Sequence, residues 1–358
     1  MKIRNYFFLS LFSIGFLVSC SSDDDNGGDF PEDPGFYSGG YFILNEGVFG
    51  SGNTTVSYVD VENGEVERDI YGPANNDASL GDVGQSMGFH GDYAFIVVNV
   101  SNKVEVVHRN TFERVASIEE GLSNPRYIDF IDDKAYVTNW GDGNNPEDDF
   151  IAVIDLNNFE VVDNIVTQEG PEEIVAHNGR LYVNLIGGWN FNDKLAVVDP
   201  TTKRIDEVEV GIMPNSVEIA DGFVWVSAGG YPNYTEQESA GKISQIDLQT
   251  LEMVEAFDLP NATDHPYNLE VENGSVYYSL GKSIYTFEIG ATQLPVEPVL
   301  ELTEVAVFRS MEIYENLLWV TSATTDYTSN GKLLVYDLDT YSLIDSFDVG
   351  INPNGIYH

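Results

Sequence analysis

The side chains best suited to bind a ligand are aromatic residues that follow predicted strands instead of lying within them. Flat rings offer a large contact area at low entropic cost, and they stack on sugars, corrin rings and aromatic chelators. Trp225 and Trp319 lie inside predicted strands, where packing between sheets accounts for them. The loop aromatics either bind a ligand or pack against their own loops. They are Phe49, Trp140, Trp189, Phe191, Tyr231, Tyr234 and Tyr327.

A second candidate set occupies equivalent positions near the start of each sequence repeat, where we expect it to surround the mouth of a central channel. Arg126 and Arg309 are notable because the chain has 16 Lys and Arg residues against 59 Asp and Glu. Two guanidinium groups could hold an anion by paired hydrogen bonds. The alternative is that they pair with carboxylates such as Glu172. The set is Gln85, Arg126, Glu172, Asn215, Tyr267, Arg309 and Asn354.

One loop concentrates the hard oxygen atoms that calcium prefers. Its donors are Asp142, Asn144, Glu147, Asp148 and Asp149. The spacing differs from an EF-hand, because Pro146 takes the fifth position and no Glu stands at the twelfth. We therefore predict no required cofactor, and calcium as an optional ligand of Asp142, Asn144 and Asp148.

These residues must be positioned by a strand pattern that repeats along the chain. Alternating apolar residues, β-branched and aromatic enrichment, and turn pairs such as Asn178-Gly179 predict strands throughout, with no amphipathic helix of usual length. The class is all-β. The repeats begin at Gly84, Pro125, Pro171, Pro214, Pro266, Phe308 and Pro353, at spacings of 41, 46, 43, 52, 42 and 45 residues. Such periods are typical of stacked or circular arrays.

The two ends of the chain supply complementary fragments of one further repeat. Segments 41–45, 56–60 and 64–70 match second, third and fourth strands, and 352–358 matches a first strand. The ends therefore complete a seventh unit, which is how a circular array closes. We predict a seven-bladed β-propeller of four-stranded antiparallel blades over residues 36–358, with the C-terminal strand joining the N-terminal blade. The sixth unit, ending near Glu288, departs from the pattern.

Loop lengths predict which face of this propeller is functional. The turns on one face are mostly two residues long. The loops between second and third strands, on the opposite face, are long and rich in glycine and aromatic residues, and such loops on a rigid scaffold usually carry function. They span 46–55, 140–149, 185–194, 228–242 and 323–332.

The N-terminal segment predicts an exported, lipid-anchored protein. Lys2 and Arg4 precede an apolar run, 6–18, that is too short to span a bilayer. Leu17-Val18-Ser19-Cys20 resembles a bacterial lipobox, with residues 1–19 as signal peptide and Cys20, the only cysteine, as the lipidated residue. The alternative is an ordinary secretory signal.

Residues 20–35 form an acidic tether that we expect to be disordered. Its aspartate run resembles a signal for the outer face of the outer membrane; the alternative is a solvated spacer. A net charge of −43 excludes nucleic acid as a partner and disfavours anionic headgroups, which leaves the lipid as the membrane anchor.

Tyr136-Val137-Thr138-Asn139, with weaker copies at 181–184 and 318–321, resembles the repeat of the YVTN (YncE-like) β-propellers over nearly the whole mature chain. The plan of anchor, tether and propeller is also similar to that of surface lipoproteins that capture cobalamin or iron chelates. The resemblance implies a non-catalytic binding protein for a small nutrient (cobalamin, iron chelate or glycan), with a TonB-dependent outer-membrane transporter as partner.

Two other functions remain open. One is a propeller enzyme of lyase or lactonase type, which needs histidines or a metal at the channel mouth. Only His265 is placed for that, while His90, His108 and His177 fall at other turns, so we predict no enzyme. The other is an adhesive or protein-interaction scaffold.

Overall fold

A computed structural model describes residues 37–358, which comprise 28 strands and one short helix. The predicted signal peptide (1–19), lipidated Cys20 and tether (20–35) lie outside these described residues. Residues 37–358 make up one compact unit. Within it, no helix is long and apolar enough to cross a membrane.

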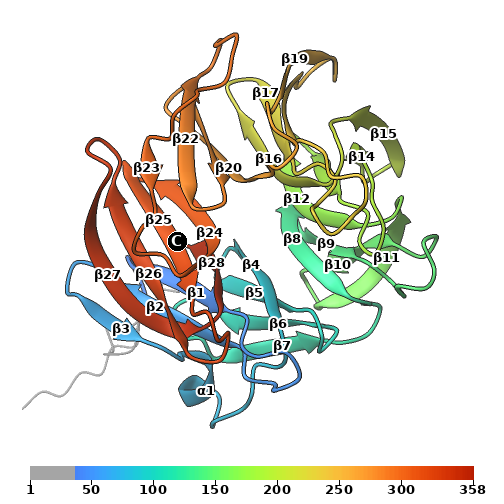
Figure 1. Ribbon diagram of the computed structural model, residues 1–358. Helices are drawn as coiled ribbons and strands as arrows, with labels where there is room; N and C mark the ends of the chain where they lie inside the picture. The colour runs from blue at the N-terminus through green and yellow to red at the C-terminus, as the bar shows by residue number, and fades with distance from the viewer. Residues whose placement is uncertain (1–36) are drawn as a thin grey trace, which may run out of the picture. The chain divides into compact units, whose positions relative to one another are not determined.

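The strands form seven four-stranded antiparallel sheets, which confirms the predicted β-propeller (Figure 1). Blade 1 combines both ends of the chain, and blades 2 to 7 follow in sequence. Blade 1 contains β28 (Pro353–Tyr357), β1 (Tyr41–Asn45), β2 (Thr55–Asp60) and β3 (Glu65–Glu67); blade 2 contains β4 (Gly84–His90), β5 (Tyr93–Val98), β6 (Lys103–His108) and β7 (Arg114–Ile118); blade 3 contains β8 (Pro125–Ile131), β9 (Lys134–Asn139), β10 (Phe150–Asp155) and β11 (Glu160–Val166).

The remaining blades repeat this order. Blade 4 contains β12 (Pro171–His177), β13 (Arg180–Leu185), β14 (Lys194–Asp199) and β15 (Arg204–Glu209); blade 5 contains β16 (Pro214–Ala220), β17 (Phe223–Ala228), β18 (Lys242–Asp247) and β19 (Met253–Asp258); blade 6 contains β20 (Pro266–Glu272), β21 (Ser275–Leu280), β22 (Ser283–Glu288) and β23 (Leu300–Glu301); blade 7 contains β24 (Val307–Tyr314), β25 (Leu317–Ala323), β26 (Asn330–Asp337) and β27 (Ser342–Ile351). The first strand of each blade faces the centre of the ring (Figure 1).

The core lies between the faces of neighbouring blades, so the middle strands are buried on both sides and read as continuous apolar runs. Trp225 packs with Phe257 and Phe287 between blades 5 and 6. Trp319 of blade 7 stacks on Tyr41 of blade 1, with ring centroids 3.9 Å apart. Both tryptophans are fully buried, as predicted.

Two details of the strand prediction were wrong. Strand β24 begins one residue before Phe308. The predicted strand 64–70 is only Glu65–Glu67 and leads into helix α1 (Tyr71–Ala74). The Asp69 carboxylate accepts hydrogen bonds from the Tyr71 and Gly72 amides, at 3.1 and 3.0 Å, which turns the chain into this helix.

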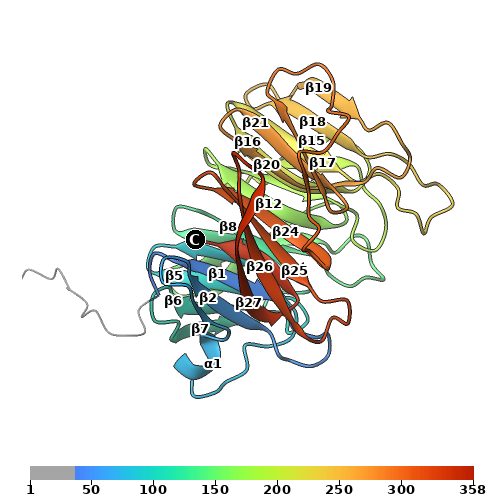
Figure 2. The same cartoon turned by 60° about the vertical axis from the view of Figure 1, so that its left-hand side comes forward.

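The ring is closed by β28, which pairs antiparallel with β1 as predicted. The register places Phe42 opposite Tyr357 and Ile43 opposite Ile356. Two more backbone bonds extend the junction, from the Glu46 and Gly47 amides to Asn352 and Ile351. Figure 2, from a second direction, shows β27 of blade 7 beside blade 1. Since blade 1 has no other first strand, the fold depends on this pairing.

Shortening a side chain in the closing strand β28 should therefore lower the free energy of unfolding far more than shortening one in an outer strand. Ile356→Ala removes a side chain that is 6% exposed and should lower the free energy of unfolding by about 2 to 5 kcal/mol. Val162→Ala, on a side chain 50% exposed in β11, should change it by about 0.5 kcal/mol or less. Urea denaturation measures both. If Ile356→Ala lowered the free energy of unfolding as little as Val162→Ala, β28 would contribute little to stability.

Candidate functional site

Four of the predicted loop aromatics meet along three neighbouring blades. Trp140 follows β9, Trp189 and Phe191 follow β13, and Tyr231 follows β17. The Trp140 and Trp189 rings meet edge to face with centroids 6.4 Å apart, and those of Phe191 and Tyr231 lie 5.2 Å apart in the same geometry. We call these four residues the aromatic ledge. Its members come from blades 3, 4 and 5.

Glycines in the same loops allow these rings to lie close to the backbone. A Cβ atom on Gly143 would collide with the Trp189 indole. Gly188, at φ 56°, adopts a left-handed conformation beside the Trp140 ring. Trp189 nevertheless stays 64% exposed. The loops thus keep the large apolar ring of Trp189 exposed to solvent, so another flat group can stack on it.

The other three predicted aromatics lie on separate loops. Phe49 and Tyr234 are each 77% exposed and Tyr327 is 46% exposed. Within residues 37–358 none of the three contacts another aromatic ring. The predicted set therefore divides into two ring pairs, which share the loop after β13 and make up the ledge, and three isolated side chains.

Arg126 connects the ledge to an inter-blade ion pair. Its guanidinium lies 4.0 Å above the centre of the Trp140 ring and donates two hydrogen bonds, of 2.8 and 2.7 Å, to the Glu172 carboxylate. Trp140 Nε1 donates to the Pro171 carbonyl at 3.1 Å. Arg309 pairs with Glu46 instead. Both arginines therefore pair with carboxylates, which was the alternative in the sequence analysis, and they do not bind one anion together.

Two of the remaining predicted mouth residues, Asn215 and Asn354, join neighbouring first strands. The Asn215 side-chain amide donates to the Pro266 carbonyl at 2.9 Å. The Asn354 side-chain amide donates to the backbone carbonyls of Gly84 at 2.9 Å and of Gln85 at 3.4 Å. Tyr267 is 47% exposed. Of the seven predicted residues, four line the central cavity: Asn215, Tyr267, Arg309 and Asn354.

The central cavity, of about 260 Å³, contains an acidic cluster that the sequence analysis missed. We call Glu173, Glu218, Glu270 and Glu312 the channel glutamates. Within residues 37–358 none of them forms a salt bridge. Three of them stand four residues after the repeat starts Pro214, Pro266 and Phe308. That recurrence is the signal that could have identified them.

Enclosure in the channel favours the neutral form of these carboxyl groups. Burial raises the pKa of Glu173 to about 8, against the opposing hydrogen bond from the Val217 amide. Burial, and then the charges of Glu173 and Glu312, raise the pKa of Glu218 to about 8. Burial raises the pKa of Glu312 to about 7. The channel therefore retains protons near neutral pH.

The acids predicted to bind calcium accept hydrogen bonds within their own loop. Asp142 accepts from the Asn144 amide at 3.0 Å, and Asp148 accepts from the Asp142 amide at 3.2 Å. Asp149 is buried and accepts from the Gly170 amide, while burial raises its pKa to about 6. In the described part of the chain, no three His, Cys, Asp or Glu side chains are arranged to hold a metal ion.

The histidines are held apart by local contacts. His265 binds the Gly229 carbonyl through Nδ1 at 2.6 Å and lies 3.4 Å from Glu238. His90 stacks on Phe130, and His358 packs against Tyr314. His265 is thus tied to the loop between β17 and β18.

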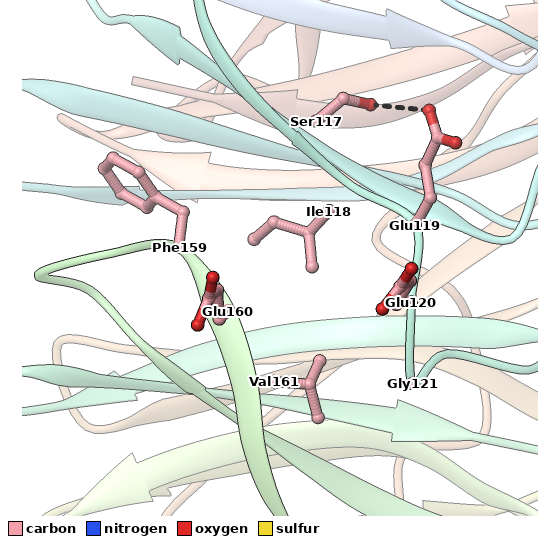
Figure 3. Close-up of a pocket in the computed structure, with 8 residues that line it drawn as sticks. All are labelled: Ser117, Ile118, Glu119, Glu120, Gly121, Phe159, Glu160 and Val161. Carbon is pink, nitrogen blue, oxygen red and sulfur yellow. Dashed lines mark hydrogen bonds between the residues drawn. The ribbon is translucent and has the colours of Figure 1, made fainter.

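Another cavity, of about 860 Å³, lies between the outer strands of blades 2 and 3 (Figure 3). Ile118, Phe159 and Val161 form its apolar part, with the side chains of Glu120 and Glu160 directed toward the space between the two strands. It contains none of the predicted site residues.

The fold and its loops define a seven-bladed β-propeller with one elaborated face. The family model described as "Domain of unknown function (DUF5074)" matches residues 39–345, and the chain belongs to this family. No curated protein matches the sequence.

Solved structures share the fold at low sequence identity. A Bacteroides fragilis protein provisionally assigned as a 6-phosphogluconolactonase aligns with 90% of this chain and 99% of its own, with TM-score 0.62 and 14% identity. Hydrazine synthase from Kuenenia stuttgartiensis aligns with 88% of this chain and 99% of its own, with TM-score 0.61 and 15% identity. The dihydro-heme d1 dehydrogenase NirN aligns with 92% of this chain and 76% of its own, with TM-score 0.56 and 13% identity.

The channel glutamates should make stability fall as pH rises. An unfolded glutamate titrates near pH 4.5, whereas the folded pKa values of Glu173 and Glu218 are about 8, so the folded state binds more protons between these values. The melting temperature should therefore decrease from about pH 5 to pH 8.

Glu218→Gln should raise the melting temperature at pH 8.5 by about 2 to 4 °C and change it little at pH 5. Glu62→Gln, on an exposed turn, is the control and should have no pH-dependent effect. Differential scanning fluorimetry measures both. A Glu218→Gln effect of equal size at both pH values would contradict the assignment.

Proposed function

We propose that this protein is a non-catalytic surface lipoprotein that binds a small nutrient ligand on the aromatic ledge. The observation that carries the proposal is Trp189, a large ring held 64% exposed beside Trp140 and above Gly143. Exposing an indole to water is unfavourable, and a flat ligand that covers the ring relieves that cost.

The chemistry around the ledge favours ligands that combine a flat or apolar face with polar edges. Trp189, Phe191 and Tyr231 supply stacking surfaces, and the Arg126–Glu172 pair supplies hydrogen-bonding groups beside Trp140. Cobalamin, an aromatic iron chelate and a glycan all have this character. The resemblance to YVTN-repeat lipoproteins and the predicted lipidation of Cys20 support attachment to the outside of the outer membrane, with delivery to a TonB-dependent transporter.

The absence of catalysis belongs to the same proposal. His265 is engaged by the Gly229 carbonyl and Glu238, while His90, His108 and His358 contact aromatic rings of other blades. A lyase or lactonase would need several such groups at one place.

A ligand screen should identify the nutrient class. Thermal shift of residues 37–358 against cobalamins, haem, ferric chelates and oligosaccharides should give one class that raises the melting temperature, since a ligand that binds the folded state stabilises it by mass action. If all four classes leave it unchanged while a purified surface protein binds the same face, the protein is an adhesive or interaction scaffold.

Variants of the ledge should locate the site. Trp189→Ala and Trp140→Ala should each weaken binding of the ligand found by about tenfold or more. Phe49→Ala removes a still more exposed ring with no aromatic neighbour and should leave the affinity near that of the wild type. Isothermal titration calorimetry measures all three. Unchanged affinity in both tryptophan variants would remove the ledge as the site.

A further inference from the structure

Blade 6 differs from the other blades in its outer strand. β23 contains only Leu300 and Glu301, which pair with Ile284 and Ser283 of β22. Every other outer strand pairs with its neighbour over three or more residues. The outer edge of β22 from Tyr285 to Glu288 therefore has no strand partner among residues 37–358. This is the unit whose sequence departs from the repeat.

Two prolines explain why the pairing stops. With Leu300 opposite Ile284, a continued register would place Pro298 opposite Thr286. Proline has no amide hydrogen to donate to a neighbouring strand, and Pro295 restricts the same segment. The last bond to β22 is from the Val299 amide to the Ile284 carbonyl, at 2.8 Å.

The backbone groups of Thr286 face this open edge. The Ile289 amide bonds to Gly274, on the side of β21, whereas the Ile284 carbonyl bonds outward to Val299. Backbone groups alternate in direction along a strand, so those of Thr286 point outward like those of Ile284. No residue of the 289–299 connection forms a backbone hydrogen bond with Thr286. An unpaired edge of this kind can template another strand.

A cavity of about 620 Å³ lies next to the edge, between blade 6 and the outer strand of blade 5. Tyr278 and Tyr285 stack within it with ring centroids 5.3 Å apart. Leu280 and Leu294 also line it, and Val296 at its border is 89% exposed. This cavity can accept an apolar side chain from a strand that pairs with β22.

The surroundings of the edge are acidic. Glu255, Asp258 and Asp264 line the cavity, and Asp258 is paired with Lys242 at 3.3 Å. Burial, and then the charges of Glu301, Asp264 and Glu297, raise the pKa of Tyr285. A partner segment that carries Lys or Arg would complement this charge.

We infer that the outer edge of β22 at Tyr285–Glu288 is a docking site for an extended basic polypeptide segment, which adds to blade 6 as a strand. Main-chain hydrogen bonds to Thr286 would hold the segment. Alternate side chains would enter the cavity beside Tyr285, and its basic residues would meet the surrounding carboxylates. This site lies on a different blade from the aromatic ledge and does not require the ledge to bind a nutrient.

The test uses a fluorescein-labelled octapeptide of alternating lysine and valine as probe. Fluorescence polarisation with the full chain should show saturable binding. The same peptide with alternate N-methylated amides has identical charge but lacks the amide hydrogens needed for strand pairing, and it should bind about tenfold or more weakly. Since the protein is strongly acidic, this comparison separates edge pairing from nonspecific attraction. Equal affinity of the two peptides would overturn the inference.

Two protein variants locate the binding. Thr286→Pro removes the outward amide and should also weaken binding by about tenfold or more, whereas Thr286→Val keeps the amide and should bind like the wild type. Should Thr286→Pro fail to fold, chemical shift changes of the wild type on peptide addition replace it, and they should centre on residues 284–288. Binding that is insensitive to Thr286→Pro, or shift changes confined elsewhere, would contradict the site.

Discussion

The pairing of β28 with β1 is the constraint on which the rest of the structure depends. Blade 1 obtains its first strand from the other end of the chain, so the ring exists only when Phe42 and Ile43 lie opposite Tyr357 and Ile356. Closure leaves no first or last blade exposed to solvent. It also fixes the circumference, and hence the distances between loops that come from different blades.

Hydrogen bonds to side chains of the first strands connect several neighbouring blades around the channel. The Ala176, Val217 and Leu269 amides donate to Asp129, Glu173 and Ser216, at 2.6, 2.8 and 3.2 Å. The Met87 amide donates to the Tyr357 hydroxyl at 3.0 Å across the closure. These bonds hold the first strands in register. The Arg126–Glu172 pair also joins two blades, and its Arg126 guanidinium lies over the Trp140 ring. The ledge is therefore attached to the most constrained part of the ring.

The strands and the buried Trp225 and Trp319 could be predicted because alternation of apolar residues is a local property of a sequence. The closure could be predicted because the repeat period shows that the two ends of the chain complete one unit. The channel glutamates were missed because each acid alone resembles a solvated residue, although Glu218, Glu270 and Glu312 recur four residues after the repeat starts. Helix α1 escaped prediction because it has only four residues and its turn depends on hydrogen bonds from the Tyr71 and Gly72 amides to Asp69. The shortened β23 could have been anticipated from Pro295 and Pro298. The contacts between loop aromatics could not be predicted, because they depend on the relative placement of three blades.

The proposed binding site for a small molecule is the aromatic ledge of blades 3 to 5. The most direct measurement is a crystal structure of residues 37–358 with the ligand that stabilises them. We predict a ligand ring stacked on Trp189, with polar contacts toward Arg126 and Glu172. A ligand located on another face, with the Trp189 indole still open to solvent, would contradict the account.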